Sequence, residues 1–311
     1  MTSANLKGFE TRAHEVEAFR SMTAGYLPLK FAYSGSAAET HDRLARSEGY
    51  QRVVGSAIDD VAALRAMLAP EGIPLQWADL GPGNGVHTLA MGAALADDAS
   101  RGRRYLGLDF SRRLMRRAET TLAVSNVTDR AFGEWDFENG PTDAVTKWRS
   151  AAPVLWTLNG ITLCNVEDPV EVIRNIALSA ERPDIVFATI AVADGRDDGQ
   201  ARVAEYDTDV FRAAVLEPLL MAGIAREAGV LELSYAAQEP AVIGLFRFTQ
   251  GYKLTCHGDA HVFQAGDVIR CFVSRRFTRR QIDALVAASG VPLRGRMKDQ
   301  NSPRERLLFD V

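Results

Sequence analysis

The sequence predicts an α/β protein in which a doubly wound, mainly parallel sheet is joined to a second, α+β domain. Short apolar runs alternate with helical patterns between residues 75 and 193, a cadence typical of a parallel sheet with helices on both faces. One run, residues 185–192, is uncharged and almost entirely apolar, as a strand buried on both faces should be. A glycine-rich loop follows the first run directly and opens a helix.

The elements of the expected sheet can be placed in order along the chain. Ser111 is a natural N-cap for the helix that follows the second strand. Ahead of the sheet, Ile58, Val61, Leu64 and Leu68 recur at helical spacing. The expected strands cover residues 75–80, 104–108, 130–134, 154–158 and 185–192, the helices between them cover 86–95, 111–124 and 169–178, and earlier helices cover 9–22, 37–47 and 54–67.

After Ala193 the alternation breaks, and a polar connection precedes a different kind of pattern. A long helix is expected over residues 209–228, strands over 231–235, 242–248 and 268–274, a helix over 278–288 and a last strand over 306–310. The strands are close together, which indicates antiparallel pairing. We therefore expect one domain from residues 56–195 and 275–311, and a substrate-binding or lid domain from residues 1–55 and 196–274.

Composition narrows the class of protein. The 311 residues are 47% hydrophobic and 24% charged, with a net charge of −4, which is ordinary for a globular protein and gives no basic footprint for nucleic acid. No apolar stretch approaches the length of a membrane span, and residues 1–20 lack the apolar core of a signal peptide. Three cysteines without a CxxC spacing suit a reducing compartment. These features predict a cytoplasmic monomer or weak homodimer.

One cluster of potential metal ligands, Cys256, His257, Asp259 and His261, falls in a short polar segment. A closed zinc site needs four ligands, usually as two spaced pairs. A hairpin turn is the better interpretation, and no metal site is predicted.

The best functional signal is the segment Asp79-Leu80-Gly81-Pro82-Gly83-Asn84-Gly85. Glycines allow tight turns and close approach of a ligand to the backbone, and the helix beyond presents free N–H groups. The spacing G-x-G-x-G differs from the dinucleotide fingerprint, and the preceding Asp79 would repel a pyrophosphate. The acid can instead hold an ammonium group or order the loop, which favours S-adenosylmethionine (SAM) as the ligand.

Two further acids end the next two strands. Asp109, in the segment with Phe110 and Ser111, is placed to accept the ribose hydroxyls. Asp136 is placed to accept the adenine amino group, while Phe137 packs near the ring. Successive strand ends line one edge of the sheet, where ligands bind in this architecture. The alternative is a glycine turn with solvated strand-end acids.

Together these segments resemble the class I SAM-dependent methyltransferases, whose fold is Rossmann-like. More narrowly, the chain resembles the histidine-specific N-alpha-methyltransferases of the ergothioneine pathway, from about Leu27 to the C-terminus. Five segments in order support the resemblance: 27–36 (Leu-Pro-x-Lys-Phe-x-Tyr-Ser-x-Ser), 136–138 (Asp-Phe-Glu), 160–165 (Gly-Ile-Thr-Leu-Cys-Asn), 205–207 (Glu-Tyr-Asp, opening the long helix) and 269–278, a strand that lines the amino-acid pocket.

The resemblance implies roles for four residues. Asn165 and Tyr206 would hold the substrate carboxylate or amine, Tyr33 would lie near the reacting nitrogen, and Ser274 would contact the substrate side chain. Each also has a structural alternative: a buried tyrosine for Tyr33, a turn cap for Asn165, packing at the domain junction for Tyr206 and an ordinary strand serine for Ser274.

One departure from the family pattern concerns specificity. The family has a Glu two residues before the serine, where this chain has Phe272. An apolar ring cannot accept an imidazole N–H, and burying that donor unpaired costs about 1–3 kcal/mol. The sequence therefore predicts methylation of the amine of an amino acid or related small molecule, not histidine. Two alternatives stay open: a cyclase, in which the SAM amine attacks its own chain and releases methylthioadenosine and an azetidine-2-carboxylate-type amino acid, and a non-catalytic SAM-binding protein.

Overall fold

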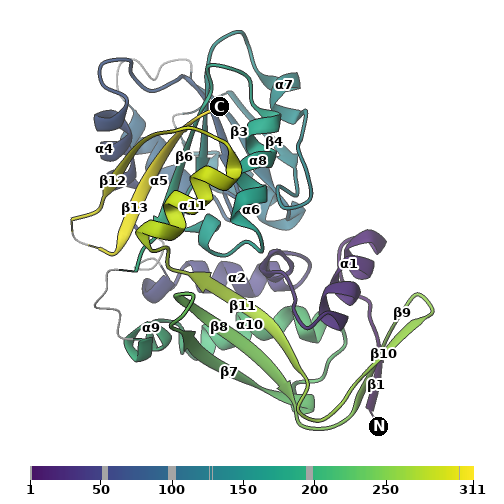
Figure 1. Cartoon of the computed structure of the whole chain (residues 1–311). Coiled ribbons are helices and arrows are strands. Elements are labelled where there is room, and N and C mark those ends of the chain that lie inside the picture. The colour runs from purple at the N-terminus through teal and green to yellow at the C-terminus, as the bar shows by residue number, and fades with distance from the viewer. Residues whose placement is uncertain are drawn as a thin grey trace. The chain divides into compact units, whose positions relative to one another are not determined.

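The computed structural model in Figure 1 describes residues 2–50, 55–96, 103–125, 127, 129–193, 199–300 and 302–311. The chain divides into two compact units, each made of two segments. Unit 1 comprises Met1–Tyr50 and Arg196–Arg275, and unit 2 comprises Gln51–Gly195 and Arg276–Val311. The functional roles expected of the two domains stay a prediction.

Unit 2 is built on a seven-stranded sheet in the order β12-β13-β6-β5-β2-β3-β4. Five neighbouring strands, β2 to β6, run parallel, whereas β13 is antiparallel to β6 and to β12. The order reverses between β2 and β5, so the predicted doubly wound sheet is confirmed. The strands are β2 (Gln76–Leu80), β3 (Arg104–Asp109), β4 (Asp129–Glu134), β5 (Val154–Leu158), β6 (Ile185–Ala191), β12 (Leu293–Lys298) and β13 (Arg304–Asp310).

Helices cover both faces of this sheet, because alternate residues of its central strands point to opposite sides. On β2, Trp77 packs in one core, while Ala78 and Leu80 pack in the other. The Trp77 core includes residues of α4, α5 and α6, and the Ala78 core includes residues of α8 and α11 (Figure 1). The helices of unit 2 are α4 (Ala57–Met67), α5 (Val86–Leu95), α6 (Arg112–Leu122), α7 (Ala144–Trp148), the 3-10 helix η3 (Thr162–Cys164), α8 (Pro169–Ser179) and α11 (Arg279–Ser289).

Helix starts in unit 2 follow from local sequence. Asp168 caps α8 by accepting from the backbone N–H groups of Val170 and Glu171, and Pro169 occupies the first turn, where no donor is needed. Thr278 and Gln281 form a reciprocal capping box at the start of α11. These caps fix where the two helices leave the sheet.

Unit 1 combines helices with two three-stranded sheets, as an α+β domain should. One sheet is antiparallel in the order β11-β8-β7, and the other, β1-β9-β10, has β1 parallel to β9. Its strands are β1 (Thr2–Asn5), β7 (Gly229–Ala236), β8 (Ala241–Phe248), β9 (Tyr252–Cys256), β10 (Asp259–Phe263) and β11 (Val268–Arg275). Its helices are α1 (Arg12–Thr23), η1 (Leu29–Tyr33), α2 (Ala37–Ala45), α9 (Gly199–Tyr206), α10 (Asp209–Met221) and η4 (Arg226–Ala228).

The helix predicted over residues 209–228 was too long. It ends at Met221, because Gly223 adopts φ +87° and its N–H group closes a turn on Leu220. The segment 205–207 does not open this helix either. Tyr206 ends the separate helix α9, and Thr208 caps α10 by accepting from Phe211 N–H at 3.2 Å.

Neither a bilayer-spanning helix nor a cluster of metal ligands occurs among the described residues. None of the helices in the described ranges combines the length and apolar character needed to cross a bilayer. Within the same ranges, His, Cys, Asp and Glu side chains do not gather in groups of three or more that could hold a metal ion. His257, from the polar turn between β9 and β10, instead lies with Nε2 2.8 Å from Glu15 Oε2.

Candidate functional site

The glycine loop, residues 79–85, joins β2 to α5 and has the geometry that its sequence predicts. Gly81, Gly83 and Gly85 adopt φ values of +68°, +58° and +78°. A Cβ atom at Gly85 would lie 2.9 Å from Ala118 Cα, so α6 could not approach as it does. A Cβ at Gly83 would have no described atom within 4 Å beyond its chain neighbours. The backbone at Gly83 therefore faces open space that a ligand can occupy.

Asp79 is almost fully buried beneath this loop. Its carboxylate accepts from Thr88 Oγ1 at 2.6 Å, Thr157 Oγ1 at 2.7 Å and Asn159 Nδ2 at 3.2 Å. Burial raises the pKa of Asp79, and the hydrogen bonds from the two threonines act against that rise. Of the two roles expected for this acid, the arrangement favours ordering of the loop over contact with an ammonium group.

Asp109 is the last residue of β3, and its carboxylate binds backbone N–H groups in the segments that follow β2 and β3. Its Oδ2 accepts from Gly83 N–H at 3.1 Å and its Oδ1 from Ser111 N–H at 2.8 Å. Ser111 caps α6 through Leu114 N–H and is fully buried, and Phe110 is also buried. The carboxylate therefore lies against the bare glycine of the loop, whereas Phe110 and Ser111 have structural roles of their own.

Asp136 and Phe137 follow β4 and are both half-buried. Asp136 accepts from Glu138 N–H at 3.2 Å and from Asn139 Nδ2 at 2.8 Å. A Cβ at Gly81 would lie 3.9 Å from Phe137 Cε1, so the ring borders the glycine loop. The structure thus brings Asp109 and Phe137 to the loop from two neighbouring strand ends.

Asn159 is a polar residue at this edge that the sequence analysis missed. It follows β5 and donates to Asp79, while its Oδ1 is buried with no hydrogen-bond partner among the described residues. A buried acceptor without a donor is costly, by about 1–3 kcal/mol, and suits a ligand N–H group. Its position directly after a strand, like those of Asp109 and Asp136, is the signal that could have identified it.

Asn165, the substrate-binding asparagine implied by the family resemblance, also belongs to unit 2. It forms the C-cap of the short helix η3, and its backbone N–H donates to Thr162 O at 3.0 Å. Its Oδ1 is buried without a hydrogen-bond partner in the described parts of the chain. The backbone of Asn165 thus has the capping role given above as the structural alternative. Its side-chain oxygen has no hydrogen-bond partner among the described residues.

The other substrate candidates lie in unit 1, where three of them meet. Tyr206 Oη and Ser274 Oγ are 3.0 Å apart. The Phe272 ring lies 5.2 Å from the Tyr206 ring and 4.8 Å from that of Phe211, centroid to centroid. We call Tyr206, Phe211, Phe272 and Ser274 the aromatic cluster. All four are buried, so the ring of Phe272 forms part of an apolar wall.

Tyr33 lies in a second group of rings in unit 1. Its ring is 4.5 Å from that of His41, which is 5.6 Å from that of Tyr50, both edge to face. Burial lowers the pKa of His41 to about 4, although the charge of Asp42 acts against it. Burial also raises the pKa of Tyr50, and the nearby Tyr206 adds to that rise. We call these three residues the tyrosine–histidine row; no feature of the sequence singled out His41.

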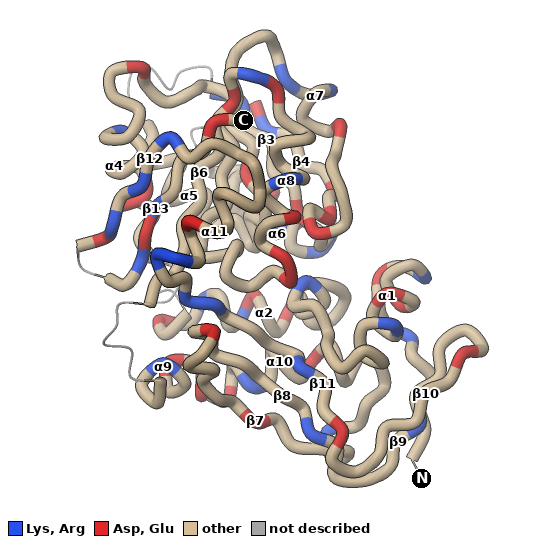
Figure 2. The backbone as a smooth tube through the Cα atoms, in the orientation of Figure 1, with Lys and Arg blue, Asp and Glu red and all other residues tan. Residues whose placement is uncertain are grey.

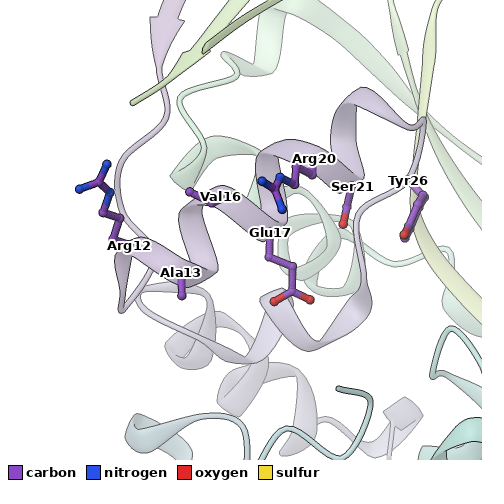
Figure 3. Close-up of a pocket in the computed structure, with 7 residues that line it drawn as sticks. All are labelled: Arg12, Ala13, Val16, Glu17, Arg20, Ser21 and Tyr26. Carbon is purple, nitrogen blue, oxygen red and sulfur yellow. The ribbon is translucent and has the colours of Figure 1, made fainter. Parts of the chain in front are cut away.

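A separate cavity of about 600 Å³ in unit 1 contains none of the predicted site residues. It is formed by one side of α1 and by Tyr26, as Figure 3 shows. Arg12, Glu17 and Arg20 supply its charges, and Glu17 pairs with Lys30 at 2.5 Å. It offers no convergent set of polar groups comparable to the glycine loop.

Comparisons with known proteins give matches among solved structures alone. No family model matches the chain, and no curated protein is significantly similar to it. Among solved structures it is similar to a SAM-dependent methyltransferase from Clostridium acetobutylicum, at 11% identity and TM-score 0.47 over 89% of this chain and 98% of that one. It is also similar to magnesium protoporphyrin IX methyltransferase from Synechocystis PCC 6803, at 13% identity and TM-score 0.44, over 90% of this chain and 97% of that one. A third similar structure is CalS10, an amino pentose methyltransferase from Micromonospora echinaspora, at 13% identity and TM-score 0.40, over 88% of this chain and 95% of that one. None of these three is named as an ergothioneine-pathway enzyme, so that narrower resemblance stays a prediction.

Proposed function

We propose that the chain is a SAM-dependent methyltransferase that acts on the amine of an amino acid or a related small molecule other than histidine. The observation that carries the proposal is the contact between Asp109 and Gly83. It places a strand-end carboxylate beside open backbone at the point where the strand order reverses, which is where ligands bind in doubly wound sheets.

The residues around the loop fit the chemistry of SAM. Gly83 leaves room for a ligand against the backbone, and Asp109 is the acceptor we assign to the ribose hydroxyls. The unpartnered Oδ1 of Asn159 suits the ammonium group of the amino-acid end. Phe137, beside Gly81, offers a ring face for adenine. Asp79 accepts hydrogen bonds from Asn159 and from Thr88 of α5, and so holds Asn159 and the loop in position.

When bound, SAM supplies a methyl group already activated by its sulfonium, so the protein has to provide alignment and a dry site. The buried aromatic cluster of unit 1 supplies an apolar surface from which water is excluded. A reacting amine must be neutral, so its proton needs an acceptor. His41 lies beside Tyr33, but burial holds its pKa near 4, which makes its imidazole a poor proton acceptor. The proton of the amine therefore passes to water.

The packing around Phe272 supports exclusion of histidine as the substrate. Its ring is surrounded by those of Tyr206 and Phe211, and the Tyr206 hydroxyl already interacts with Ser274. An imidazole N–H placed there would lack a carboxylate acceptor. Apolar or very small amine substrates suit such a wall better.

A binding experiment tests the SAM site. We expect SAM to bind the full chain in isothermal titration calorimetry, and Asp109→Ala to weaken it by about 100-fold, since acceptor and loop contact are lost together. Asp109→Asn keeps the side-chain volume, so a loss of SAM affinity in this variant as well would not come from a packing defect. Glu134→Ala is the matched control, because Glu134 lies opposite Asp109 on β4 but is exposed. Absence of SAM binding, or equal affinity of Asp109→Ala and wild type, would refute the site.

A product assay tests the reaction. The chain is incubated with SAM alone and with a panel of amino acids and small amines, and products are identified by mass spectrometry. S-adenosylhomocysteine together with a methylated amine supports methyl transfer. Methylthioadenosine formed without an acceptor would instead establish the cyclase alternative, and SAM that is bound but never consumed would indicate a non-catalytic protein.

A further inference from the structure

A second cavity, of about 500 Å³, lies within unit 2 at the end of β6. The chain just after this strand is held on both sides: Val192 N–H donates to Pro303 O at 2.9 Å, and Ala193 N–H donates to Phe277 O at 3.1 Å. Val192, Phe277 and Ile282 give the cavity an apolar lining. Its walls are therefore fixed by backbone pairing with neighbouring segments of unit 2.

The charged lining of this cavity is mainly basic. It contains Arg279, Arg296, Lys298 and Arg304 against only two acids, Asp299 and Glu305. Lys and Arg segments along β12 and β13 and at the start of α11 are visible in Figure 2.

Both acids already have cationic partners. Glu305 pairs with Arg296, and Asp299 Oδ2 lies 3.3 Å from a guanidinium nitrogen of Arg306. The charge of Asp299 also acts on Arg304, so both acids are already engaged with cations of this part of unit 2.

Two other cations of the lining have no acidic partner in the described chain. Arg279 and Lys298 form no ion pair within the described residues. Burial lowers the pKa of Arg304; Asp299 and Asp60 oppose that effect, and the neighbouring cations Arg306 and Arg276 add to it. Arg279 and Lys298 are exposed, whereas Arg304 is partly buried. Like charges that line one cavity repel one another, and an anion would relieve that repulsion.

A hydroxyl group adds a neutral donor to the same wall. Ser302 Oγ is buried and has no hydrogen-bond partner among the described residues. A hydroxyl beside two cations is a common way to bind an oxyanion, because it donates without adding charge.

We propose that this cavity binds a small organic oxyanion, a carboxylate or phosphate ester with a compact apolar body. The apolar part lies on Phe277, Val192 and Ile282, and the oxyanion is held by Arg279, Lys298 and Ser302. The site is separate from the glycine loop and does not depend on the SAM proposal.

Titration calorimetry on the full chain at low ionic strength tests the proposal. The probes are benzoate and phenyl phosphate, which distinguish a carboxylate from a phosphate ligand, and benzamide, an uncharged molecule of nearly the same shape. We expect at least one oxyanion to bind roughly tenfold more tightly than benzamide.

Four single variants assign the binding to this cavity. Arg279→Gln and Lys298→Gln should each weaken the oxyanion roughly tenfold. Arg280→Gln, which removes the adjacent charge on the same helix, and Lys147→Gln, on exposed α7, should leave it unchanged, because neither side chain lines the cavity. All four should leave SAM affinity unaffected, so failure of this site and failure of the SAM site are distinguishable. Equal binding of benzamide, no binding of either oxyanion, or equal losses in site and control variants would overturn the proposal.

Discussion

The glycine loop of unit 2 and the aromatic cluster of unit 1 differ in how far their polar atoms are hydrogen-bonded within the protein. At the loop, Gly83 borders open space and Asn159 keeps a buried oxygen without a hydrogen-bond partner in the described chain. In the cluster, Tyr206 and Ser274 satisfy each other, and Phe211 and Phe272 fill the space beside them. The loop is thus prepared to bind polar groups of a ligand, whereas the cluster is prepared to exclude water. This contrast has measurable consequences for stability, SAM affinity and turnover.

The largest change is expected in the free energy of unfolding, and it tests whether water is excluded from His41 in unit 1. Because burial lowers the folded-state pKa of His41 from 6.5 to about 4, protonation favours the unfolded chain. This residue's contribution is fully present above about pH 6.5 and is lost as the pH falls toward 4. The loss should reach about 3 kcal/mol in the free energy of unfolding, measured by urea titration across this range.

His41→Phe should remove that pH dependence, while Tyr50→Phe, which keeps an aromatic ring beside His41, should retain it. If wild type and His41→Phe lose stability in parallel on acidification, the tyrosine–histidine row is not dry, and the exclusion of water inferred for unit 1 fails at that row.

The second effect concerns the open space at the loop. Gly83→Ala and Gly290→Ala both force a methyl group onto a residue with positive φ, +58° and +71°, and neither methyl would meet a described atom. Both variants should therefore lose about 1 kcal/mol of stability. Only Gly83→Ala should lose SAM affinity, by roughly 30-fold or about 2 kcal/mol, since its methyl group fills ligand space. Equal SAM affinities in calorimetry would mean that the space at Gly83 is not used.

The smallest change is expected at the hydrogen bond between Tyr206 and Ser274, where a structural role can be distinguished from a catalytic one. A double-mutant cycle of Tyr206→Phe and Ser274→Ala should give a coupling of about 1 kcal/mol in unfolding, the net worth of one buried hydrogen bond. SAM affinity should be unchanged in all three variants. A purely structural Tyr206 predicts nearly normal turnover, whereas a large fall in kcat with unchanged SAM affinity would assign the hydroxyl a part in the reaction.

Most of the sheet of unit 2 could be predicted from the sequence, because β5 and β6 are short apolar runs and the other parallel strands alternate regularly with helical segments. Strand β12 escaped notice although Leu293 and Met297 alternate with Arg294, Arg296 and Lys298, because Gly295 interrupts the apolar side of that alternation; the pairing with β13 defines the strand. In unit 1, the helix expected over residues 209–228 looked continuous because the segment is rich in helix formers. Gly223 ends it through backbone geometry that composition does not reveal.

Local sequence was enough to predict the glycine loop and its acid Asp109, because tight turns and strand ends depend on residues close together in the chain. The burial of Asp79 beneath the loop, and the Asn159 oxygen without a hydrogen-bond partner in the described chain, depend on the pairing of β2 with β5. The burial of His41 beside Tyr33 and Tyr50 depends on how the rest of unit 1 packs over these residues. Solvation is a property of the packed chain, and no local pattern of residues specifies it.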